Sequence, residues 1–244
     1  MSSSPTSRPV RLPPPDLATQ QLPRTRQIAR AWFRVHPKGL NAIYFSLNPG
    51  HRYSHPKCPN PILYVVAIDP ETCLLERFGD YLYDNARQLP LTVWDSTVIS
   101  RIDAPPFHLC DLSKTTTRSA LTVDLTALMN ADVSVPLQWG LEIQNHPSQV
   151  PAIKFKSRFT DKACLAIFDL PGIGAQLKEA ALGPLSAYNP ALDWLTKHQV
   201  TLVYPPRAAN TSNRPAPAPP PRVCHTFCIQ WQSKVTQYAQ LPSR

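Results

Sequence analysis

Hydrophobic residues in the middle of the chain gather in short runs that turn-forming residues separate. The runs are five to seven residues long and hold many β-branched and aromatic side chains, a pattern that predicts β-strands. One run, 62–68, is apolar without interruption, as in a strand buried on both faces. The strands are predicted at residues 31–35, 42–47, 62–68, 152–158 and 163–169.

A helical period follows the strand at 62–68. Asp69 and Pro70 supply a capping side chain and a proline for the first turn, so the helix is predicted over residues 70–87. Its apolar stripe consists of Leu75, Phe78 and Leu82. Further helices are predicted at 175–182 and 190–199. These elements indicate an α+β fold, with several strands around few helices.

The two ends of the chain differ from its middle in proline content. Of 29 prolines, 14 fall in residues 1–31 and 205–244. Proline fixes φ and removes a backbone donor, so such stretches disfavour both helix and sheet. We therefore predict a disordered tail at 1–27, a folded domain at 28–204 and a Pro-rich basic tail at 205–244. A short apolar patch at 223–231 follows the polyproline-type spacer at 207–222.

The formal charge of +9 is concentrated in the same two ends. Residues 1–31 hold five arginines and one aspartate (+4), residues 205–244 hold five basic residues and no acid (+5), and the remainder sums to zero. Phosphate neutralisation normally needs clustered Lys and Arg on a folded face, so the neutral middle argues against a dedicated nucleic-acid domain. The tails favour weak, salt-sensitive adhesion to anionic partners.

No run of about 18 apolar residues is present, so no membrane-spanning segment is predicted. The N-terminus lacks the apolar stretch of a secretory signal, which favours the cytoplasm, although its Arg- and Ser-bearing start leaves an organellar transit peptide open. The six scattered cysteines are interpreted as reduced thiols. Cys224 and Cys228 resemble half of a metal site, but no second ligand pair lies nearby, so no metal is predicted.

Several polar residues lie next to the predicted apolar surfaces. Glu76 borders the stripe of the first helix, and Ser157 continues the apolar face of its strand. Arg52 lies in the Pro-rich loop at 48–61. Each has an ordinary interpretation as well: a solvated helix acid, a hairpin hydroxyl and a loop charge. By the same reasoning Tyr64 is a core residue and Arg34 an ion-pair partner.

Five segments together resemble the RES family, bacterial proteins named for an Arg, a Glu and a Ser, many of them toxins of toxin–antitoxin pairs. The segments occur in the family's order, on the elements predicted above. They are AWFRVH at 31–36, GHRY at 50–53, ILYV at 62–65, TCLLE at 72–76, and KFKSR at 154–158 followed by ACLAIF at 163–168. The resemblance covers most of residues 30–170. His51 departs from the family pattern, which joins the Gly and the Arg directly.

The resemblance implies an ADP-ribosyltransferase-like fold that binds NAD⁺ as substrate and cleaves its nicotinamide–ribose bond, by hydrolysis or with phosphate as acceptor. Glu76 would stabilise the oxocarbenium-like centre and hold the ribose hydroxyls. Arg52 would bind the pyrophosphate, with Arg34 as a second candidate. Tyr64 would stack on nicotinamide, and the Ser157 hydroxyl would hold a ribose or the amide.

Two other functions stay open at this stage. One is transfer of ADP-ribose to a macromolecule. The other is a catalytically silent binding module that uses the basic tails on nucleic acid. The resemblance further suggests an antitoxin protein as partner. The acceptor and the oligomeric state stay open, and an oligomer is compatible with the sequence.

Overall fold

An eight-stranded sheet forms the centre of the part of the chain that the structure describes. The computed structural model describes residues 12–48, 51–130 and 132–204. All neighbouring strands are antiparallel except β6 and β7, which are parallel. In sheet order the strands are β1 (Thr25–Gln27), β6 (Phe107–Asp111), β7 (Ala152–Lys156), β8 (Ala163–Phe168), β3 (Ile62–Ala67), β2 (Arg30–Pro37), β5 (Thr97–Ala104) and β9 (Lys178–Pro184).

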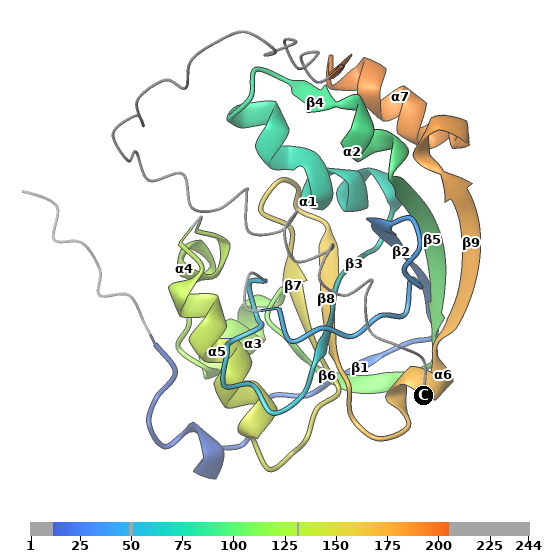
Figure 1. The fold of residues 1–244 in the computed structure, drawn as a ribbon. Coiled ribbons are helices and arrows are strands. Elements are labelled where there is room, and N and C mark those ends of the chain that lie inside the picture. The colour runs from blue at the N-terminus through green and yellow to red at the C-terminus, as the bar shows by residue number, and fades with distance from the viewer. Residues whose placement is uncertain (1–11, 49–50, 131, 205–244) are drawn as a thin grey trace, which may run out of the picture. The chain divides into compact units, whose positions relative to one another are not determined.

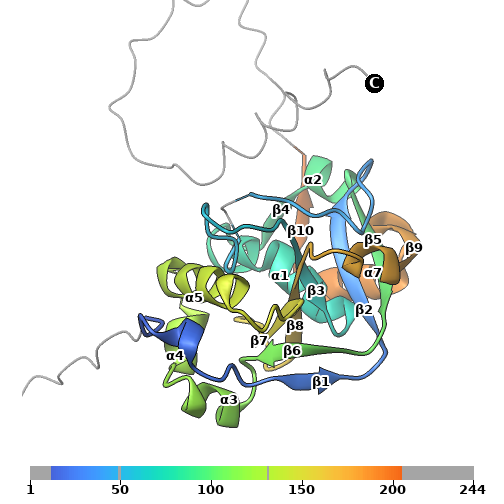
Figure 2. The same ribbon diagram turned by 90° about the horizontal axis from the view of Figure 1, so that it is seen from below.

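Helices and a small second sheet surround these strands (Figures 1 and 2). The second sheet is a parallel pair of β4 (Gln88–Pro90) and β10 (Thr201–Val203). The helices are α1 (Pro70–Tyr83), α2 (Leu91–Asp95), α3 (Thr115–Ala120), α4 (Leu125–Met129), α5 (Ser134–Asn145), α6 (Ile173–Gln176) and α7 (Asn189–Lys197), with short 3₁₀ turns at Leu17–Thr19 and Leu185–Ala187. The described region is thus a mixed α+β fold with few helices, as the sequence predicts, and its large sheet is curled.

Strands β2 and β3 share only one paired position in the large sheet. Phe33 lies opposite Ala67, whereas β2 and β5 pair at eight positions. Beyond Phe33 the free edge of β2 contacts α1 instead, because the Val35 amide donates to the Cys73 sulfur over 3.0 Å. The Cys73 thiol in turn donates to the Phe33 carbonyl over 3.3 Å. We call this division between β2 and β3, filled at one end by Cys73, the sheet split.

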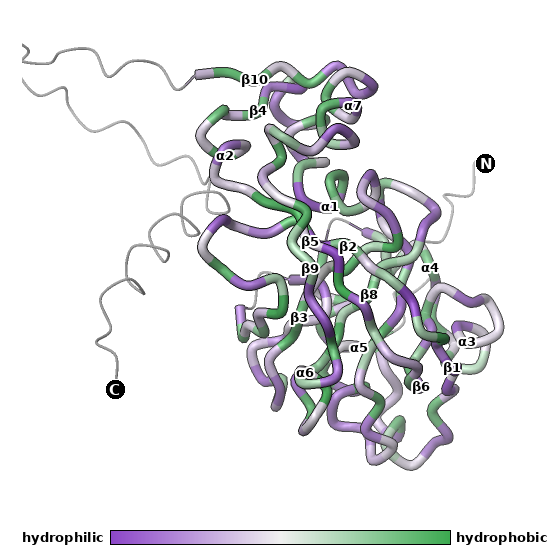
Figure 3. Tube along the Cα trace, turned by 90° about the vertical axis from the view of Figure 1, so that its right-hand side faces the viewer, coloured by the Kyte–Doolittle hydropathy of each residue, from purple (hydrophilic) through white to green (hydrophobic). Residues whose placement is uncertain are grey.

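Two hydrophobic clusters cover the two faces of the sheet. The larger holds Phe78, Trp94, Trp139 and Trp194, together with the buried faces of the main helices. The smaller is centred on Trp32 and lies on the opposite face. Figure 3 shows hydrophobic and hydrophilic stretches alternating along strands and helices, as expected for elements with one buried face.

Most of the predicted elements around the RES-like motifs are confirmed. The predicted strands at 31–35, 62–68, 152–158 and 163–169 correspond to β2, β3, β7 and β8. The helix predicted from residue 70 begins there as α1, and the helix predicted at 190–199 corresponds to α7. Residues 51–61 of the predicted loop contain no helix or strand.

Two predicted elements differ from the structure, and a third has the wrong end. Residues 42–47 form no strand, and Ser46 makes only an isolated bridge to Ile62. Of the helix predicted at 175–182, only Ala175 and Gln176 are helical, at the end of α6. Residues 178–184 form the edge strand β9, because pairing with β5 overrides the helix propensity of this Ala- and Leu-containing segment. Helix α1 ends at Tyr83 rather than at residue 87, and Ala86 and Arg87 adopt positive φ values of 48° and 62° that a helix does not allow.

The folded part of the chain begins closer to the N-terminus than the sequence predicts. Residues 12–27 were expected to fall in a disordered tail, yet Leu17 and Leu22 are buried and β1 pairs with β6. These two leucines are spaced among prolines and polar residues without a regular period. The sequence therefore contains no pattern from which their burial could be predicted. The expected tails at 1–11 and 205–244, the patch at 223–231 and the pair Cys224 and Cys228 lie outside the described residues.

Four of the six cysteines lie in the part of the chain that the structure describes. Cys58, Cys73, Cys110 and Cys164 are free and buried, as predicted for reduced thiols. Among the described residues, no group of three or more His, Cys, Asp or Glu side chains is placed to hold a metal ion. In the same residues, no helix is both long and apolar enough to cross a membrane.

Candidate functional site

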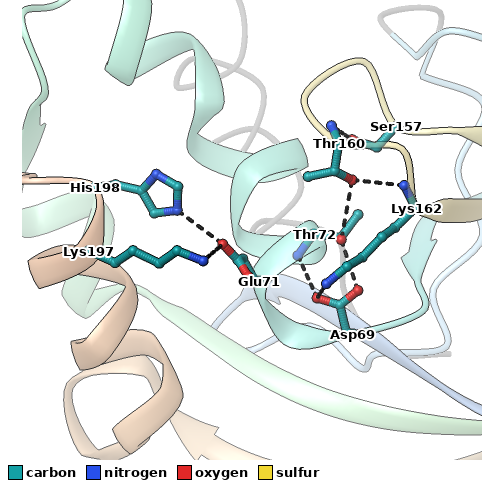
Figure 4. Close-up of polar contacts among 8 residues, drawn as sticks. All are labelled: Asp69, Glu71, Thr72, Ser157, Thr160, Lys162, Lys197 and His198. Atoms are coloured by element: carbon teal, nitrogen blue, oxygen red, sulfur yellow. Dashed lines mark hydrogen bonds and ion pairs between the residues drawn. The ribbon is translucent and has the colours of Figure 1, made fainter.

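The start of helix α1 is tied directly to the hairpin between β7 and β8. Asp69 caps the helix by accepting a hydrogen bond from the Thr72 amide over 3.0 Å. Thr72 Oγ1 also lies 3.4 Å from Thr160 Oγ1 in the hairpin, and Lys162 Nζ lies 3.4 Å from the Asp69 carboxylate (Figure 4). These contacts fix the distance between α1 and the hairpin, which carry the two central residues of the site.

Those two residues, Glu76 and Ser157, are in direct contact. The Ser157 hydroxyl donates to Glu76 Oε1 over 2.5 Å, and the Arg158 amide donates to the same oxygen over 3.2 Å. Burial raises the pKa of the Glu76 carboxyl, while the hydrogen bond from Ser157 and the charges of Arg52 and Arg158 act in the opposite direction. The site therefore holds a desolvated carboxylate that is oriented by two donors.

Ser157 uses its full hydrogen-bonding capacity within the protein. Besides donating to Glu76, its Oγ accepts from the Phe159 amide at 3.1 Å and the Thr160 amide at 3.3 Å. A hydroxyl has one donor and two acceptor positions, and the Ser157 residue is completely buried. In this geometry Ser157 holds the hairpin turn together and orients Glu76.

Arg52 lies in the loop between β2 and β3 and is 7% exposed. Its guanidinium donates to the Leu128 carbonyl of α4. Burial raises the pKa values of Glu76 and Tyr64, and the charge of Arg52 opposes this effect at both side chains. Arg52 therefore lies in the same electrostatic environment as both. The structure thus brings Arg52 near Glu76 and uses at least one of its donors to hold the loop against α4.

Tyr64 lies in a stack of aromatic rings on the α1 side of the sheet. The His51 ring stacks on it at a centroid distance of 4.5 Å, and Phe155 lies nearly parallel at 6.1 Å. Burial, and next the charge of Glu76, raise the pKa of Tyr64 well above its usual range. Tyr64 is therefore a neutral ring, and His51 covers one of its faces.

Arg34 lies on the other side of the sheet split from Ser157. Its guanidinium donates to the Ala42 carbonyl and, over 3.4 Å, to the Tyr44 carbonyl. Burial lowers its pKa to about 10, and the charge of Arg77 acts in the same direction. Of the five predicted site residues, Glu76 and Ser157 touch. The charge of Arg52 acts on Glu76, and the charges of both act on Tyr64. The hydrogen bonds of Arg34 go instead to the carbonyls of residues 42 and 44.

Sequence reasoning missed three residues of this region. His51 covers one face of Tyr64, and Tyr53 is fully buried against Phe155 at a ring distance of 5.0 Å. Arg77 follows Glu76 directly on α1. The available signal was position: Arg77 lies four residues after Cys73, so both face the same side of the helix.

The fold and this site define an α+β protein with a split sheet and a desolvated carboxylate held against the β7–β8 hairpin. No protein-family model and no curated protein matches the chain. Among solved structures, a chain of the M. tuberculosis MbcT–MbcA toxin–antitoxin complex is similar, with a TM-score of 0.50 and 16% sequence identity. The similarity covers 69% of this chain and 91% of that chain. At this identity it concerns the fold alone.

Proposed function

We propose that this protein is a RES-type enzyme with an ADP-ribosyltransferase-like fold that binds NAD⁺ and cleaves its nicotinamide–ribose bond. Two independent lines support the proposal. The RES-like motifs occur in order along the sequence, and the chain is similar in fold to a chain of a toxin–antitoxin complex. The observation that carries the proposal is the Glu76 carboxylate held by Ser157 and the Arg158 amide.

Glu76 supplies the electrostatic part of the reaction. When the bond to nicotinamide breaks, positive charge develops on the ribose C1′ and its ring oxygen. A carboxylate fixed before the reaction stabilises that charge without reorganising, and burial strengthens the interaction because water screens it less. Ser157 is then a positioning residue, because its donor and acceptor positions hold Glu76 and the hairpin.

Tyr64 and the arginines supply binding. Nicotinamide stacks on the ring of Tyr64, and to do so it takes the place that His51 occupies 4.5 Å away. Arg52 keeps positive charge close to Glu76. Its planar guanidinium can donate two parallel hydrogen bonds to phosphate oxygens, and so can that of Arg34.

We further propose that the protein is the toxin of a toxin–antitoxin pair, with an antitoxin protein as partner. The solved structure that resembles this chain comes from a toxin–antitoxin complex. Depletion of NAD⁺ would stop cell growth, so expression of wild type should arrest growth and expression of Glu76→Gln should not. Equal growth arrest by both proteins would contradict this proposal.

The direct test is to incubate the purified full-length chain with NAD⁺, with and without inorganic phosphate, and to identify the products. Wild type should release nicotinamide. Glu76→Gln keeps shape and hydrogen bonding but removes the charge, so at saturating NAD⁺ its rate should fall about 10²- to 10³-fold, as for other preorganised electrostatic contacts. Affinity should change far less, because the interaction strengthens mainly in the transition state.

The products separate the remaining alternatives. Free ADP-ribose indicates water as the acceptor, a phosphorylated ADP-ribose indicates phosphate, and labelled macromolecule indicates ADP-ribosyl transfer. Absence of nicotinamide release by wild type under all conditions would leave the binding module as the explanation. Equal rates for wild type and Glu76→Gln would remove Glu76 from the reaction.

A further inference from the structure

A second pocket lies over β2, β5 and β9, the three strands at one edge of the large sheet (Figure 1). Its volume is about 280 Å³, and none of the five predicted site residues lines it. Small-molecule pockets in proteins have volumes of about 300–1,000 Å³, so this one suits a small ligand. Most of its lining residues are apolar, and the exceptions are His36, Lys38, Ser100 and Glu179.

The strand register places three of these polar side chains on the floor of the pocket. Ser100 of β5 lies opposite Arg34 on β2 and opposite Ala181 on β9. Side chains alternate along a strand, so His36 and Glu179, each two residues from one of these partners, lie on the same face as Ser100. The pairing of β5 with β9 shifts in register directly beside Ser100. Such bulges often redirect side chains at functional sites.

His36 and Ser100 form a buried hydrogen-bonded pair. They are 4% and 1% exposed, and His36 Nε2 lies 3.0 Å from Ser100 Oγ. His36 Nδ1 lies 3.2 Å from the Pro37 carbonyl oxygen, which can only accept, so this nitrogen carries a proton. Burial lowers the pKa of His36, which favours the neutral ring. His36 Nε2 is then an acceptor, and the Ser100 hydroxyl is its donor.

Glu179 ends beside this pair and adds an acceptor. Its Oε2 accepts from the Ala42 amide over 2.9 Å and from the Ile43 amide over 3.4 Å. Its Oε1 lies 3.5 Å from Ser100 Oγ, but the single hydroxyl proton of Ser100 cannot serve both Oε1 and His36 Nε2. Within the part of the chain that the structure describes, no ion pair includes Glu179. The floor of the pocket therefore has more acceptors than donors.

We propose that this pocket binds a small molecule with a primary ammonium group and an apolar body, a second ligand beyond the proposed function. The ammonium group supplies the donors that the floor lacks, and its charge is opposite to that of Glu179. The apolar body packs against Leu40, Val98 and Ala181. The exposed Lys38 also lines the pocket, so a carboxylate ligand is the alternative that the test must separate.

The test compares three probes of similar shape by NMR titration of the full-length chain. Phenethylamine carries the ammonium group, phenethyl alcohol replaces it with a neutral hydroxyl, and phenylpropanoate replaces it with a carboxylate. Glu179→Gln keeps the shape of the side chain and removes its charge. The matched control is Glu142→Gln, on α5 and outside the lining of the pocket. Ala181→Leu enlarges a side chain of the edge strand and fills the pocket from β9.

Wild type should bind phenethylamine at least about tenfold more tightly than either other probe. Glu179→Gln should weaken that binding about ten- to a hundredfold, as expected for a hydrogen bond between charged groups, and Glu142→Gln should bind like wild type. Ala181→Leu should weaken it by at least about tenfold, because the side chain occupies the space of the ligand. If Glu179→Gln does not give a cooperative melt, the probe preference of wild type and its loss in Ala181→Leu decide together.

Wild-type affinity for phenethylamine in a folded Glu179→Gln protein would overturn the inference, and so would retained binding in Ala181→Leu. Equal affinity for the three probes would indicate an apolar surface alone, and tighter binding of phenylpropanoate would indicate Lys38 as the anchor; each result contradicts the proposal. Absence of binding by all probes at about 10 mM also contradicts it. The proposed NAD⁺ cleavage is measured by nicotinamide release, so either proposal can fail while the other stands.

Discussion

The two walls of the candidate site are built in different ways. The first, which we call the hairpin wall, consists of α1 and residues 156–163. Hydrogen bonds from Ser157 and Arg158 to Glu76, and one between the Thr72 and Thr160 hydroxyls, hold its parts together. The second, the loop wall, consists of residues 51–61 packed on α4 and α5. It is held by the ring stack of His51 on Tyr64 and by the bond from Arg52 to a carbonyl of α4.

The difference predicts which part of the site adjusts when a ligand binds. In the hairpin wall a capped helix and a strand pair fix both ends of the Glu76–Ser157 contact, so the carboxylate is oriented before any ligand binds. In the loop wall irregular backbone carries Arg52 and His51, and the proposed stacking of nicotinamide on Tyr64 would require its ring to replace that of His51. Under the proposed function, the chemical group is thus fixed in advance, while the binding groups would adjust to the substrate.

One glycine in each wall allows a matched comparison, and it gives the largest expected effect on stability. A Cβ atom at Gly140 of α5 would lie 2.3 Å from the Tyr53 carbonyl oxygen in the loop wall. A Cβ at Gly79 of α1 would lie 2.4 Å from the Phe159 ring in the hairpin wall. Backbone yields less readily than the end of a side chain, so Gly140→Ala should destabilise by about 1–3 kcal/mol.

Gly79→Ala should lower stability less, because Phe159 is partly exposed and its ring can rotate away from α1. Alanine also favours a helix interior over glycine by about 0.5–1 kcal/mol, which offsets part of the overpacking in both variants. Thermal denaturation measures the stability of both variants, because a loss of 1 kcal/mol lowers Tm by about 2–4 °C for a domain of this size. An equal or larger loss for Gly79→Ala would show that the hairpin wall is the less adaptable one.

The hairpin wall is also the part of the site that the sequence predicts well. Asp69 and Pro70 mark the start of α1 by local chemistry, and the apolar period then fixes which side of the helix Glu76 borders. Ser157 follows from the alternation along β7. Both signals lie within a few residues of the side chain that they place, so no knowledge of distant contacts is needed.

The loop wall could not be predicted in the same way. Nothing near Arg52 in the sequence points to the Leu128 carbonyl, which is 76 residues away, and the stacking of His51 on Tyr64 depends on the path of an irregular loop. The same reason applies to β9, where pairing with β5 decides the conformation, and to the burial of Leu17 and Leu22. Long-range contacts override local preference at each of these places.

The pH dependence of turnover tests whether the hairpin wall holds a desolvated carboxylate. Burial raises the pKa of Glu76 above 4.5, so the charged form should be lost, and kcat/KM should fall, at a higher pH than for an ordinary glutamate. Stability should change in the opposite sense. Because the folded-state pKa is raised, the stabilising contribution of Glu76 is present at low pH and is lost as pH rises through that pKa.

His51 is the group in the loop wall whose titration could imitate this profile. Burial lowers its pKa to about 4. His51→Phe keeps a ring on Tyr64 and removes the titration, and it should leave the acidic limb of the kcat/KM profile in place. A limb that disappears in His51→Phe would assign the profile to the loop wall and contradict the assignment to Glu76.

The smallest expected effect concerns Ser157 and separates a positioning residue from one that touches substrate. Its hydrogen bond lowers the pKa of Glu76, so Ser157→Ala should move the acidic limb of kcat/KM to higher pH. One hydrogen bond is worth about 0.5–1.5 kcal/mol, and one pKa unit about 1.4 kcal/mol, which limits the displacement to about one pH unit. Ser100→Ala is the control, because it removes another buried hydroxyl, bonded to His36, and should leave the limb unchanged. If Ser157 instead binds the ribose or the amide directly, Ser157→Ala should raise KM while the limb stays where it is. A displaced limb with unchanged KM therefore assigns the hydroxyl to Glu76, and the opposite result assigns it to the substrate.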